Sequence, residues 1–386
     1  MARRFPIDKF ASLRTPFYYY DTALLAQTLS ALNDAVRGNE NYHVHYAIKA
    51  NYNPDILKII ADAGLGADCV SGGEVKAAVE AGFKPETIVY AGVGKSDDEI
   101  RYALSVGISR FNVESPAELE VIDSIAGQMS VVAPVSIRVN PNISAHTHAH
   151  IATGHEDDKF GINLPNLPQI IRQAVELPNV EFKGLHYHIG SQILVMNDFV
   201  SLCLRINEIN ADLARLNLPS GDVNVGGGLG IDYENPELNP IPDFEGYFSS
   251  FRNNLKYDGD VHFELGRSIV AQCGSLINRV LYIKDGVTKR FAIIDGSMTE
   301  LIRPALYNAK HKIENISASD QISKCNLCKY DVVGPVCESS DVFGENIPLP
   351  ECHRGDFIAI RSAGAYGESM SSRYNCRPLP KGVMGL

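Results

Sequence analysis

"YHVHYAIKAN", residues 42–51, joins an apolar, strand-like run to a single lysine, Lys49. Most lysines lie on solvated surfaces, so Lys49 alone indicates no more than an exposed side chain. A lysine directly after a buried strand becomes informative when reactive residues follow other strands in the same way. The remainder of the chain therefore determines how Lys49 is interpreted.

Seven similar apolar runs follow this one. The eight strand candidates are residues 42–48, 66–70, 87–92, 110–114, 135–140, 182–190, 222–228 and 260–266. Amphipathic helical patterns lie between them, including 54–64, 72–82, 115–127 and 198–217. Pro and Ser at the helix starts and Gly at several ends are typical of helix caps. Eight strand–helix units predict a (β/α)8 barrel of the TIM type.

The pattern changes after about residue 268, where strands follow one another with little helix between them. These later strands are expected at 275–286, 289–297, 329–337 and 356–364. An early strand-like run at 16–21 precedes the barrel and is expected to pair with them. The predicted fold class is α/β plus β, a barrel followed by a C-terminal β-sandwich or β-barrel domain. The domains are placed at 22–268 for the barrel and at 1–21 plus 269–386 for the β domain.

Composition restricts the partners that the chain could have. The 386 residues carry a net charge of −11, which argues against nucleic acid and anionic membranes as partners. No apolar run is long enough for a transmembrane helix, and the N-terminus does not resemble a signal peptide. Eight scattered cysteines in a chain of this length indicate reduced thiols and a cytoplasmic protein.

Reactive residues follow several of the predicted strands, and the chemistry of such a barrel lies at the C-terminal ends of its strands. These positions hold Lys49, Asp68, His188 with Ser191, and Glu264 with Gly266 and Arg267. The loop "GGGLG" (226–230) follows the seventh strand, where such barrels often bind phosphate. Its spacing does not match the dinucleotide fingerprint G-x-G-x-x-G, which favours a single phosphate group.

A phosphate site beside a lysine indicates pyridoxal 5′-phosphate, whose aldehyde forms a Schiff base with a lysine. Glu264 is placed to face the pyridine nitrogen and hold its proton. His188 is placed to stack on the ring, although a packed strand histidine paired with His186 fits the spacing equally well.

A second group of residues suits an amino-acid substrate. Arg303 and Tyr307 in "LIRPALYNA" (301–309) share one face if this segment is helical, and could bind a carboxylate. Cys337 and Glu338 in "CESSD" (337–341) could donate a proton and bind an ammonium group.

Two patterns raise the question of a metal. "CNLCKYDVVGPVC" (325–337) offers three thiols, and Cys352 or His353 could complete a zinc site. His146, His148 and His150 alternate in a loop. One C-x2-C without a second pair favours free thiols, and the loop histidines are interpreted as unliganded, so no metal is expected.

Many motifs resemble those of the diaminopimelate decarboxylases, which belong to the alanine-racemase-like (fold type III) pyridoxal-phosphate decarboxylases. The motifs are "YAIKAN" (46–51), "GADCVSGGE" (66–74), "AGVGKSDDEI" (91–100), "FNVES" (111–115), "THAHIATG" with "KFGI" (147–162), "HIGSQ" (188–192), "GGGLGI" (226–231), "IRPALY" (302–307), "GPVCESSD" (334–341) and "GAYGESMSSRYN" (364–375). The resemblance covers nearly the whole chain. "GPVCESSD" and "HIGSQ" are closer to this branch than to the ornithine or arginine decarboxylases.

The resemblance implies a role for each matching residue. Lys49 would form the Schiff base, His188 would stack on the ring, and Glu264 would face the pyridine nitrogen. The remaining cofactor-binding residues would be Asp68, Ser191, Gly227, Gly228, Gly266, Arg267 and Tyr366. Substrate would contact Arg267, Arg303, Tyr307, Glu338 and Tyr366. Cys337 would return a proton to the substrate. In this family the active sites form in a homodimer, so Cys337 and Glu338 would come from the second subunit.

One position departs from the family pattern Glu-Pro-Gly-Arg, since Leu265 replaces the proline in "ELGR" (264–267). Proline fixes φ and lacks an N–H group, so leucine restores a donor and a freer backbone before Gly266.

The expected reaction is decarboxylation of meso-2,6-diaminopimelate to L-lysine and CO2, the last step of lysine biosynthesis. Ornithine ends in an amine and has no distal carboxylate. Arg267 and Arg303 would therefore have no anionic group to bind, which argues against ornithine as the substrate. Three alternatives remain at this point: a decarboxylase of ornithine, arginine or lysine, a Schiff-base aldolase, and a non-catalytic protein that binds the cofactor.

Overall fold

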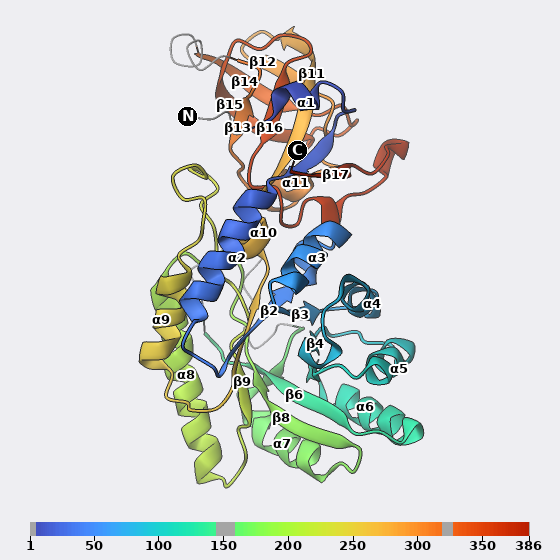
Figure 1. Ribbon diagram of the computed structural model, residues 1–386, viewed down its shortest axis with the longest axis vertical. Helices are drawn as coiled ribbons and strands as arrows, with labels where there is room; N and C mark the ends of the chain where they lie inside the picture. Colours follow the sequence, from blue (N-terminus) through green and yellow to red (C-terminus); the bar gives the residue numbers. More distant parts are fainter. Residues whose placement is uncertain (1–4, 144–158, 319–326, 386) are drawn as a thin grey trace. The chain divides into compact units, whose positions relative to one another are not determined.

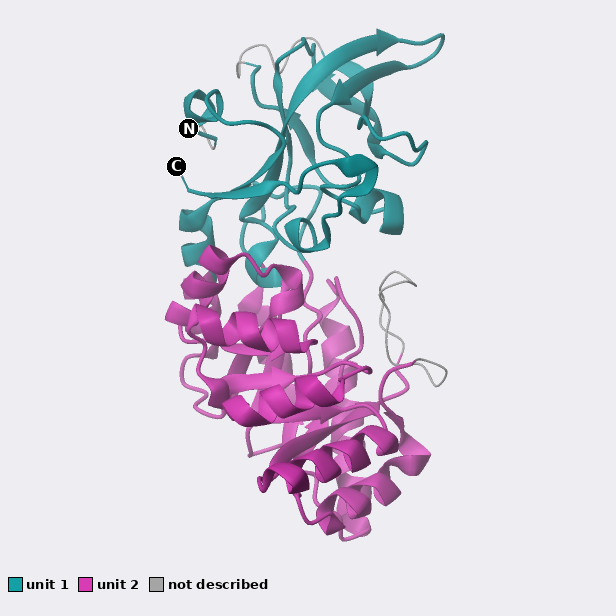
Figure 2. Ribbon diagram, turned by 90° about the vertical axis from the view of Figure 1, so that its right-hand side faces the viewer, with its two compact units in different colours: residues 1–28, 231–241, 267–386 teal, residues 29–230, 242–266 magenta. Residues whose placement is uncertain are grey.

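The computed structural model describes residues 5–143, 159–318 and 327–385, and the chain forms two units with separate sheets (Figure 2). Unit 2 comprises residues 29–230 and 242–266. Unit 1 comprises residues 1–28, 231–241 and 267–386. The loop histidines His146, His148 and His150 lie outside the described residues.

Unit 2 contains a closed barrel of eight parallel strands. The strands follow the order β5-β4-β3-β2-β10-β9-β8-β6, and β6 pairs with β5 to close the barrel. Their bounds are β2 (Tyr42–Ala47), β3 (Gly66–Cys69), β4 (Ile88–Tyr90), β5 (Arg110–Val113), β6 (Ala133–Asn140), β8 (Val180–His186), β9 (Asp222–Asn224) and β10 (Val261–Leu265). A short strand, β7 (Ile162–Asn163), pairs with β6. The predicted barrel and its eight strands are confirmed.

Helices lie outside the barrel strands (Figure 1). They are α3 (Pro54–Asp62), α4 (Gly72–Ala81), α5 (Asp97–Val106), α6 (Pro116–Met129), α7 (Leu167–Glu176), α8 (Met196–Arg215) and α9 (Phe244–Asn254), with α2 (Thr22–Val36) preceding the barrel. The predicted caps are present, since Ser71 and Ser115 accept backbone N–H groups of α4 and α6, while Gly82 and Gly107 end α4 and α5. Among the helices of the described ranges, none is long and apolar enough to cross a membrane.

Unit 1 contains a mostly antiparallel sheet of eight strands. They are β1 (Phe17–Tyr20), β11 (Gly274–Asp285), β12 (Arg290–Ile294), β13 (Ile313–Asn315), β14 (Leu327–Val333), β15 (Val342–Pro350), β16 (Phe357–Ile360) and β17 (Lys381–Met384). The early strand joins the late ones as predicted, because Phe17 of β1 pairs with Ile277 of β11. Its buried side chains pack with Phe10 and Phe357. Three short helices complete the unit: α1 (Ile7–Phe10), α10 (Arg267–Val270) and α11 (Arg303–Tyr307).

The strand ends differ slightly from the prediction. Lys49 lies in a 3-10 turn, η1 (Ile48–Ala50), because the last rung between β2 and β3 joins Ala47 to Asp68. His188 likewise follows β8, which ends at His186 where its pairing with β9 stops at Asn224. The expectation that His186 and His188 form a strand pair is therefore wrong. The backbone turns after the last paired residues. The turns, rather than the sheet, therefore set the direction of the side chains that follow.

One buried histidine on β2 makes the stability of unit 2 depend on pH. His45 contacts the Thr87 carbonyl oxygen through Nδ1 at 3.0 Å and His262 through Nε2 at 2.9 Å. Burial, together with His262, lowers the pKa of His45 from 6.5 to about 3. The folded protein therefore keeps His45 neutral at pH values where the unfolded chain binds a proton.

Acidification is consequently expected to destabilise the protein. This contribution is fully present above pH 6.5 and is lost as the pH falls towards 3, so a change from pH 7 to pH 5 costs about 2 kcal/mol through His45. Urea unfolding at the two pH values measures it, and His45→Gln is expected to reduce the pH dependence by that amount. His353→Gln, at an exposed position in unit 1, is the control. Equal pH dependence in the His45 variant and the wild type would contradict the prediction.

Candidate active site

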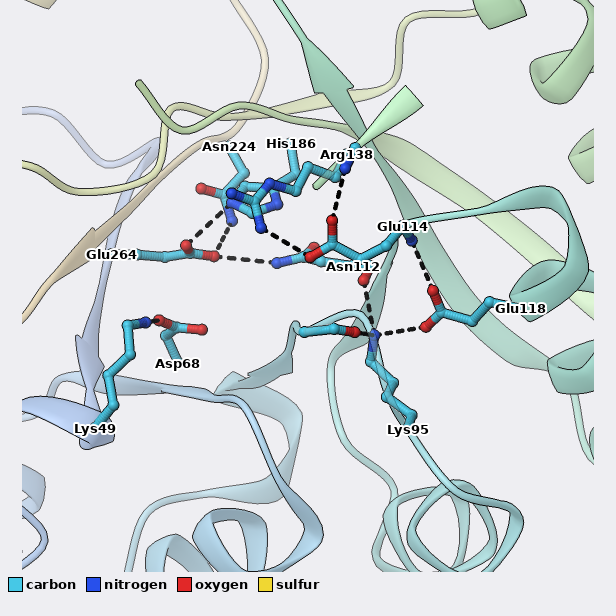
Figure 3. A network of polar contacts seen from close by, with 12 residues as sticks. Lys49, Asp68, Lys95, Asn112, Glu114, Glu118, Arg138, His186, Asn224 and Glu264 are labelled. Atoms are coloured by element: carbon cyan, nitrogen blue, oxygen red, sulfur yellow. Dashed lines mark hydrogen bonds and ion pairs between the residues drawn. The ribbon is translucent and has the colours of Figure 1, made fainter. Parts of the chain in front are cut away.

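Lys49 and Asp68 form an ion pair at the C-terminal ends of β2 and β3 (Figure 3). Lys49 Nζ lies 2.6 Å from Asp68 Oδ2, and the lysine side chain is 40% exposed whereas Asp68 is fully buried. Burial, and then the charge of Glu264, raise the pKa of Asp68 to about 6, although Lys49 opposes the shift. The Lys49 amine is therefore accessible, and the carboxylate that pairs with it is buried in the barrel.

Glu264 lies on β10 and is the acceptor for three side chains from three different strands (Figure 3). Its Oε1 accepts hydrogen bonds from Asn112 at 3.1 Å and from Asn224 at 2.7 Å. Its Oε2 lies 3.1 Å from His186 Nε2. Burial alone would raise the pKa of Glu264, but His186, Lys49 and the bonded amide of Asn224 outweigh it and lower that pKa. The carboxylate is thus held ionised and oriented inside the barrel.

The three partners of Glu264 were not identified from the sequence. A signal was available, since Asn112, His186 and Asn224 are polar residues at or next to the C-terminal ends of barrel strands, where the other candidate residues also lie. What the sequence does not give is their convergence on Glu264, because β5, β8, β9 and β10 follow one another over more than a hundred residues and meet only when the barrel closes. His186 is therefore a partner of the predicted catalytic carboxylate, a role that the sequence interpretation did not assign to it.

The glycine loop packs too closely for other residues. A Cβ at Gly227 would lie 1.9 Å from the Glu264 carbonyl oxygen, and Gly228 has a φ of +113°. The Gly227 N–H group donates to His188 Nδ1 at 3.3 Å, so neutral His188 carries its proton on Nε2. Burial, with Arg138 and Lys49, lowers the pKa of His188 to about 3. The structure therefore places a neutral imidazole beside this loop, at the same barrel end as Lys49.

Leu265 is the last residue of β10, where it pairs with Tyr46 and is buried. A leucine is therefore accommodated as an ordinary strand residue at the position of the family's proline. Gly266, which follows, fits tightly, since a Cβ there would lie 3.0 Å from the Cβ atoms of Ala47 and Ala50.

A second polar network, shown on the right of Figure 3, supports the next strands. Buried Lys95 contacts Glu118 at 2.5 Å and the Asn112 carbonyl oxygen at 3.0 Å. Glu118 accepts the Glu114 N–H group, and Glu114 pairs with Arg138 at 2.8 Å. These side chains connect β5 with β6 and fix the backbone of Asn112, one of the partners of Glu264. They too were missed, because charged residues in helix-start motifs are usually solvated caps.

The predicted substrate arginines lie in unit 1, where both are buried against aromatic rings. Arg267 donates to the Tyr233 hydroxyl at 2.6 Å and lies 4.9 Å from the centre of the Tyr366 ring. Arg303, the first residue of α11, lies 4.8 Å from the centre of the Tyr233 ring. The structure therefore brings Arg267, Arg303 and Tyr366 together around Tyr233, a residue that the sequence did not single out. The helical segment expected for Arg303 and Tyr307 is present.

Two other predicted residues of unit 1 lie at its surface, whereas Tyr307 is half-buried. Cys337 and Glu338 are exposed, and Glu338 accepts the Tyr374 hydroxyl at 2.5 Å. Cys325 of the possible zinc site lies outside the described residues. Within the ranges that the structure describes, no cluster of three His, Cys, Asp or Glu side chains could hold a metal ion.

The residues at the barrel end fit pyridoxal 5′-phosphate in three respects. The Lys49 amine is partly exposed and can reach an aldehyde. The glycine loop follows β9, the seventh strand of the barrel in chain order, where barrels of this type often bind phosphate. In the described part of the chain, Asp68 Oδ1 is buried without a hydrogen-bond partner, so it can accept a hydrogen bond from an additional donor.

Comparisons with known proteins agree with this geometry. Residues 24–271 match the family "Pyridoxal-dependent decarboxylase, pyridoxal binding domain". A diaminopimelate decarboxylase of Bacteroides thetaiotaomicron is 56% identical over 98% of this chain and 97% of its own length. The crystal structure of diaminopimelate decarboxylase from Helicobacter pylori complexed with L-lysine has 41% identity and a TM-score of 0.91, and the match covers 98% of this chain and 94% of that one. The chain therefore belongs to the diaminopimelate decarboxylases, which are pyridoxal-phosphate-dependent carboxy-lyases.

Proposed function

We propose that the protein decarboxylates meso-2,6-diaminopimelate to L-lysine and CO2, the last step of lysine biosynthesis. The observation that carries the proposal is the pairing of Lys49 with Asp68 beside an ionised Glu264, in a chain that is 56% identical to a diaminopimelate decarboxylase. The Helicobacter pylori enzyme crystallised with L-lysine supports lysine as the product.

The cofactor residues would act together at the barrel end. When bound, the cofactor supplies an electron sink for the electron pair that the departing carboxylate leaves behind. Lys49 would hold it covalently until substrate arrives, with Asp68 orienting the amine. Glu264 would keep the pyridine nitrogen protonated, and His188 would cover one face of the ring. Ser191, Gly227, Gly228, Gly266, Arg267 and Tyr366 are proposed as its remaining contacts.

Selectivity would come from the far end of the substrate, which carries both a carboxylate and an ammonium group. Arg267 and Arg303 are proposed to bind the distal carboxylate with Tyr307 and Tyr366. Two buried guanidinium groups against one tyrosine ring favour an anionic ligand, because a carboxylate can hydrogen-bond both. Glu338 would bind the distal ammonium group, and Cys337 would return a proton to the substrate α-carbon.

A homodimer with shared active sites and a cytoplasmic location are part of the proposal. The exposure of Cys337 and Glu338 leaves both side chains accessible to a second subunit. The seven cysteines of the described residues are free thiols, as expected in a reducing compartment.

A product assay on purified protein with added pyridoxal 5′-phosphate tests the proposed function. It offers meso-diaminopimelate, ornithine, arginine and lysine in parallel. Lysine formed from diaminopimelate alone is the expected result. Turnover of ornithine, arginine or lysine instead would overturn the roles given to Arg267 and Arg303. Cofactor binding without turnover of any substrate would favour the non-catalytic alternative.

A further inference from the structure

Arg303 has a hydrogen-bond partner that fixes the orientation of its guanidinium. The Nη1 atom of Arg303 lies 2.8 Å from Nε2 of His311, and both residues are buried. His311 follows α11 by four residues, and Asn308 reverses the chain between them with a φ of +52°. Nη1 of this buried arginine is thus bound to a neutral acceptor, and the Tyr233 side chain is a further hydrogen-bond partner of the guanidinium.

The other ring nitrogen of His311 is anchored to the sheet of unit 1. Its Nδ1 atom lies 2.8 Å from the carbonyl oxygen of Arg361. The Arg361 N–H group donates to the Lys312 carbonyl oxygen at 2.8 Å, which extends the antiparallel ladder between β13 and β16 by one step. The imidazole therefore connects a rigid strand to the guanidinium.

These two contacts determine the tautomer of His311. Arg303 stays protonated and can only donate, so Nε2 must accept. The Arg361 carbonyl can only accept, so Nδ1 must carry the proton. Burial, and then the charge of Arg303, lower the pKa of His311 to about 3, which agrees with a neutral ring. A second proton on Nε2 would place two donors and two positive charges against each other.

Tyr233 restricts the same pair from the side. Its ring meets that of His311 edge-on, with centroids 5.1 Å apart at 80°, while the Arg303 guanidinium lies over its face. The guanidinium is thus held by an acceptor at one nitrogen and by an aromatic face. These contacts fix the plane of the guanidinium. They therefore also fix the direction of its other N–H bonds, which can be directed at a carboxylate.

We propose that His311 is a positioning residue, which orients Arg303 through a hydrogen bond so that Arg303 can bind the distal carboxylate of the substrate. This role rests on the proposed function. His311 does not contact substrate and exchanges no proton in the reaction.

Steady-state kinetics with diaminopimelate test this role. His311→Phe keeps a flat ring but removes the acceptor, and KM is expected to rise roughly ten- to hundredfold while kcat changes little. His311→Gln offers a side-chain carbonyl to Arg303 and is expected to restore most of the affinity. In an Arg303→Ala background, His311→Phe should have no further effect on KM. His353→Phe, an exposed histidine of the same unit, is the control. An unchanged KM in His311→Phe would overturn the proposal. So would an increase in KM on adding His311→Phe to Arg303→Ala that equals the increase in the wild-type background.

Nitrogen-15 NMR of histidine-labelled holoenzyme gives a readout that does not depend on turnover. The His311 signals, assigned by their loss in His311→Gln, should show a protonated Nδ1 and a bare Nε2. A protonated Nε2 would overturn the hydrogen bond to Arg303, whatever the substrate. Wild-type protein that does not decarboxylate diaminopimelate would overturn the proposed function instead, so the two failures are distinguishable.

Discussion

Lys49→Ala is expected to lower the rate of diaminopimelate decarboxylation by roughly 10³-fold or more, because it removes the group that is proposed to hold the cofactor and release it to substrate. Lys49→Arg should be nearly as inactive, since a guanidinium retains the positive charge beside Asp68 but does not form the covalent bond. The measurements are kcat with saturating cofactor and the visible absorption of the bound cofactor. Activity within tenfold of wild type in either variant would contradict the assignment.

Stability distinguishes the two replacements of Lys49. Asp68 is fully buried and has Lys49 as its counter-ion, so alanine leaves a buried carboxylate that must bind a proton. The pKa of Asp68, already raised to about 6, should rise further in Lys49→Ala and less in Lys49→Arg. Thermal unfolding at neutral pH should therefore occur at a lower temperature in the alanine variant. Lys58→Ala, an exposed position on α3, is the control for both assays.

The same variant tests whether two subunits share each site. If Lys49 comes from one subunit and Cys337 from the other, Lys49→Ala and Cys337→Ala proteins are each inactive, but a mixed dimer has one intact site. After subunit exchange about half of the dimers are mixed, so about a quarter of wild-type activity should return. A mixture that stays inactive, although exchange is verified with tagged chains, would contradict shared sites.

Glu264→Gln is expected to lower kcat/KM by roughly 10²–10³-fold, the usual effect of removing a group that stabilises charge in the transition state. The fold should tolerate the change. The glutamine oxygen can accept from Asn112 and Asn224, and its amide can donate to His186 once that ring moves its proton to Nδ1. Nδ1 of His186 is buried without a hydrogen-bond partner in the wild type too, within the described residues, so no further atom loses a partner and the loss of activity would report the missing charge.

Cofactor titration and kinetics separate binding from chemistry in this variant. Cofactor affinity should fall less than kcat, because Lys49 and the glycine loop remain. Glu264→Asp, which keeps the charge but is shorter, should retain more activity than glutamine if charge is decisive. Glu245→Gln, an exposed glutamate on α9, is the control. Full activity in Glu264→Gln would show that the Glu264 carboxylate contributes to the fold and not to catalysis.

Several candidate residues could be located from the sequence because each lies next to a recognisable local pattern, although their roles stay predictions. Lys49, Asp68 and Glu264 stand at the ends of short apolar runs, and residues at successive strand ends of a barrel must converge. The helix around Arg303 and the pairing of β1 with the late strands were predicted on similar grounds. The predicted ends of the strands were less accurate, because a strand ends where its neighbour stops pairing with it. That is why Lys49 and His188 lie in turns.

What the sequence determined by itself was the alternation of strands and helices, the family motifs and the residues available for chemistry. Only the tertiary structure decided which polar groups contact one another. Barrel closure brings Asn112, His186 and Asn224 to Glu264, and the ladder between β13 and β16 brings the Arg361 carbonyl oxygen to the His311 ring. Such contacts join residues distant in the chain. Hydrogen bonds also require the donor–acceptor distance to be correct to within a few tenths of an ångström. A pattern along the sequence carries no such distance, so the partners of the predicted residues became visible only in the folded chain.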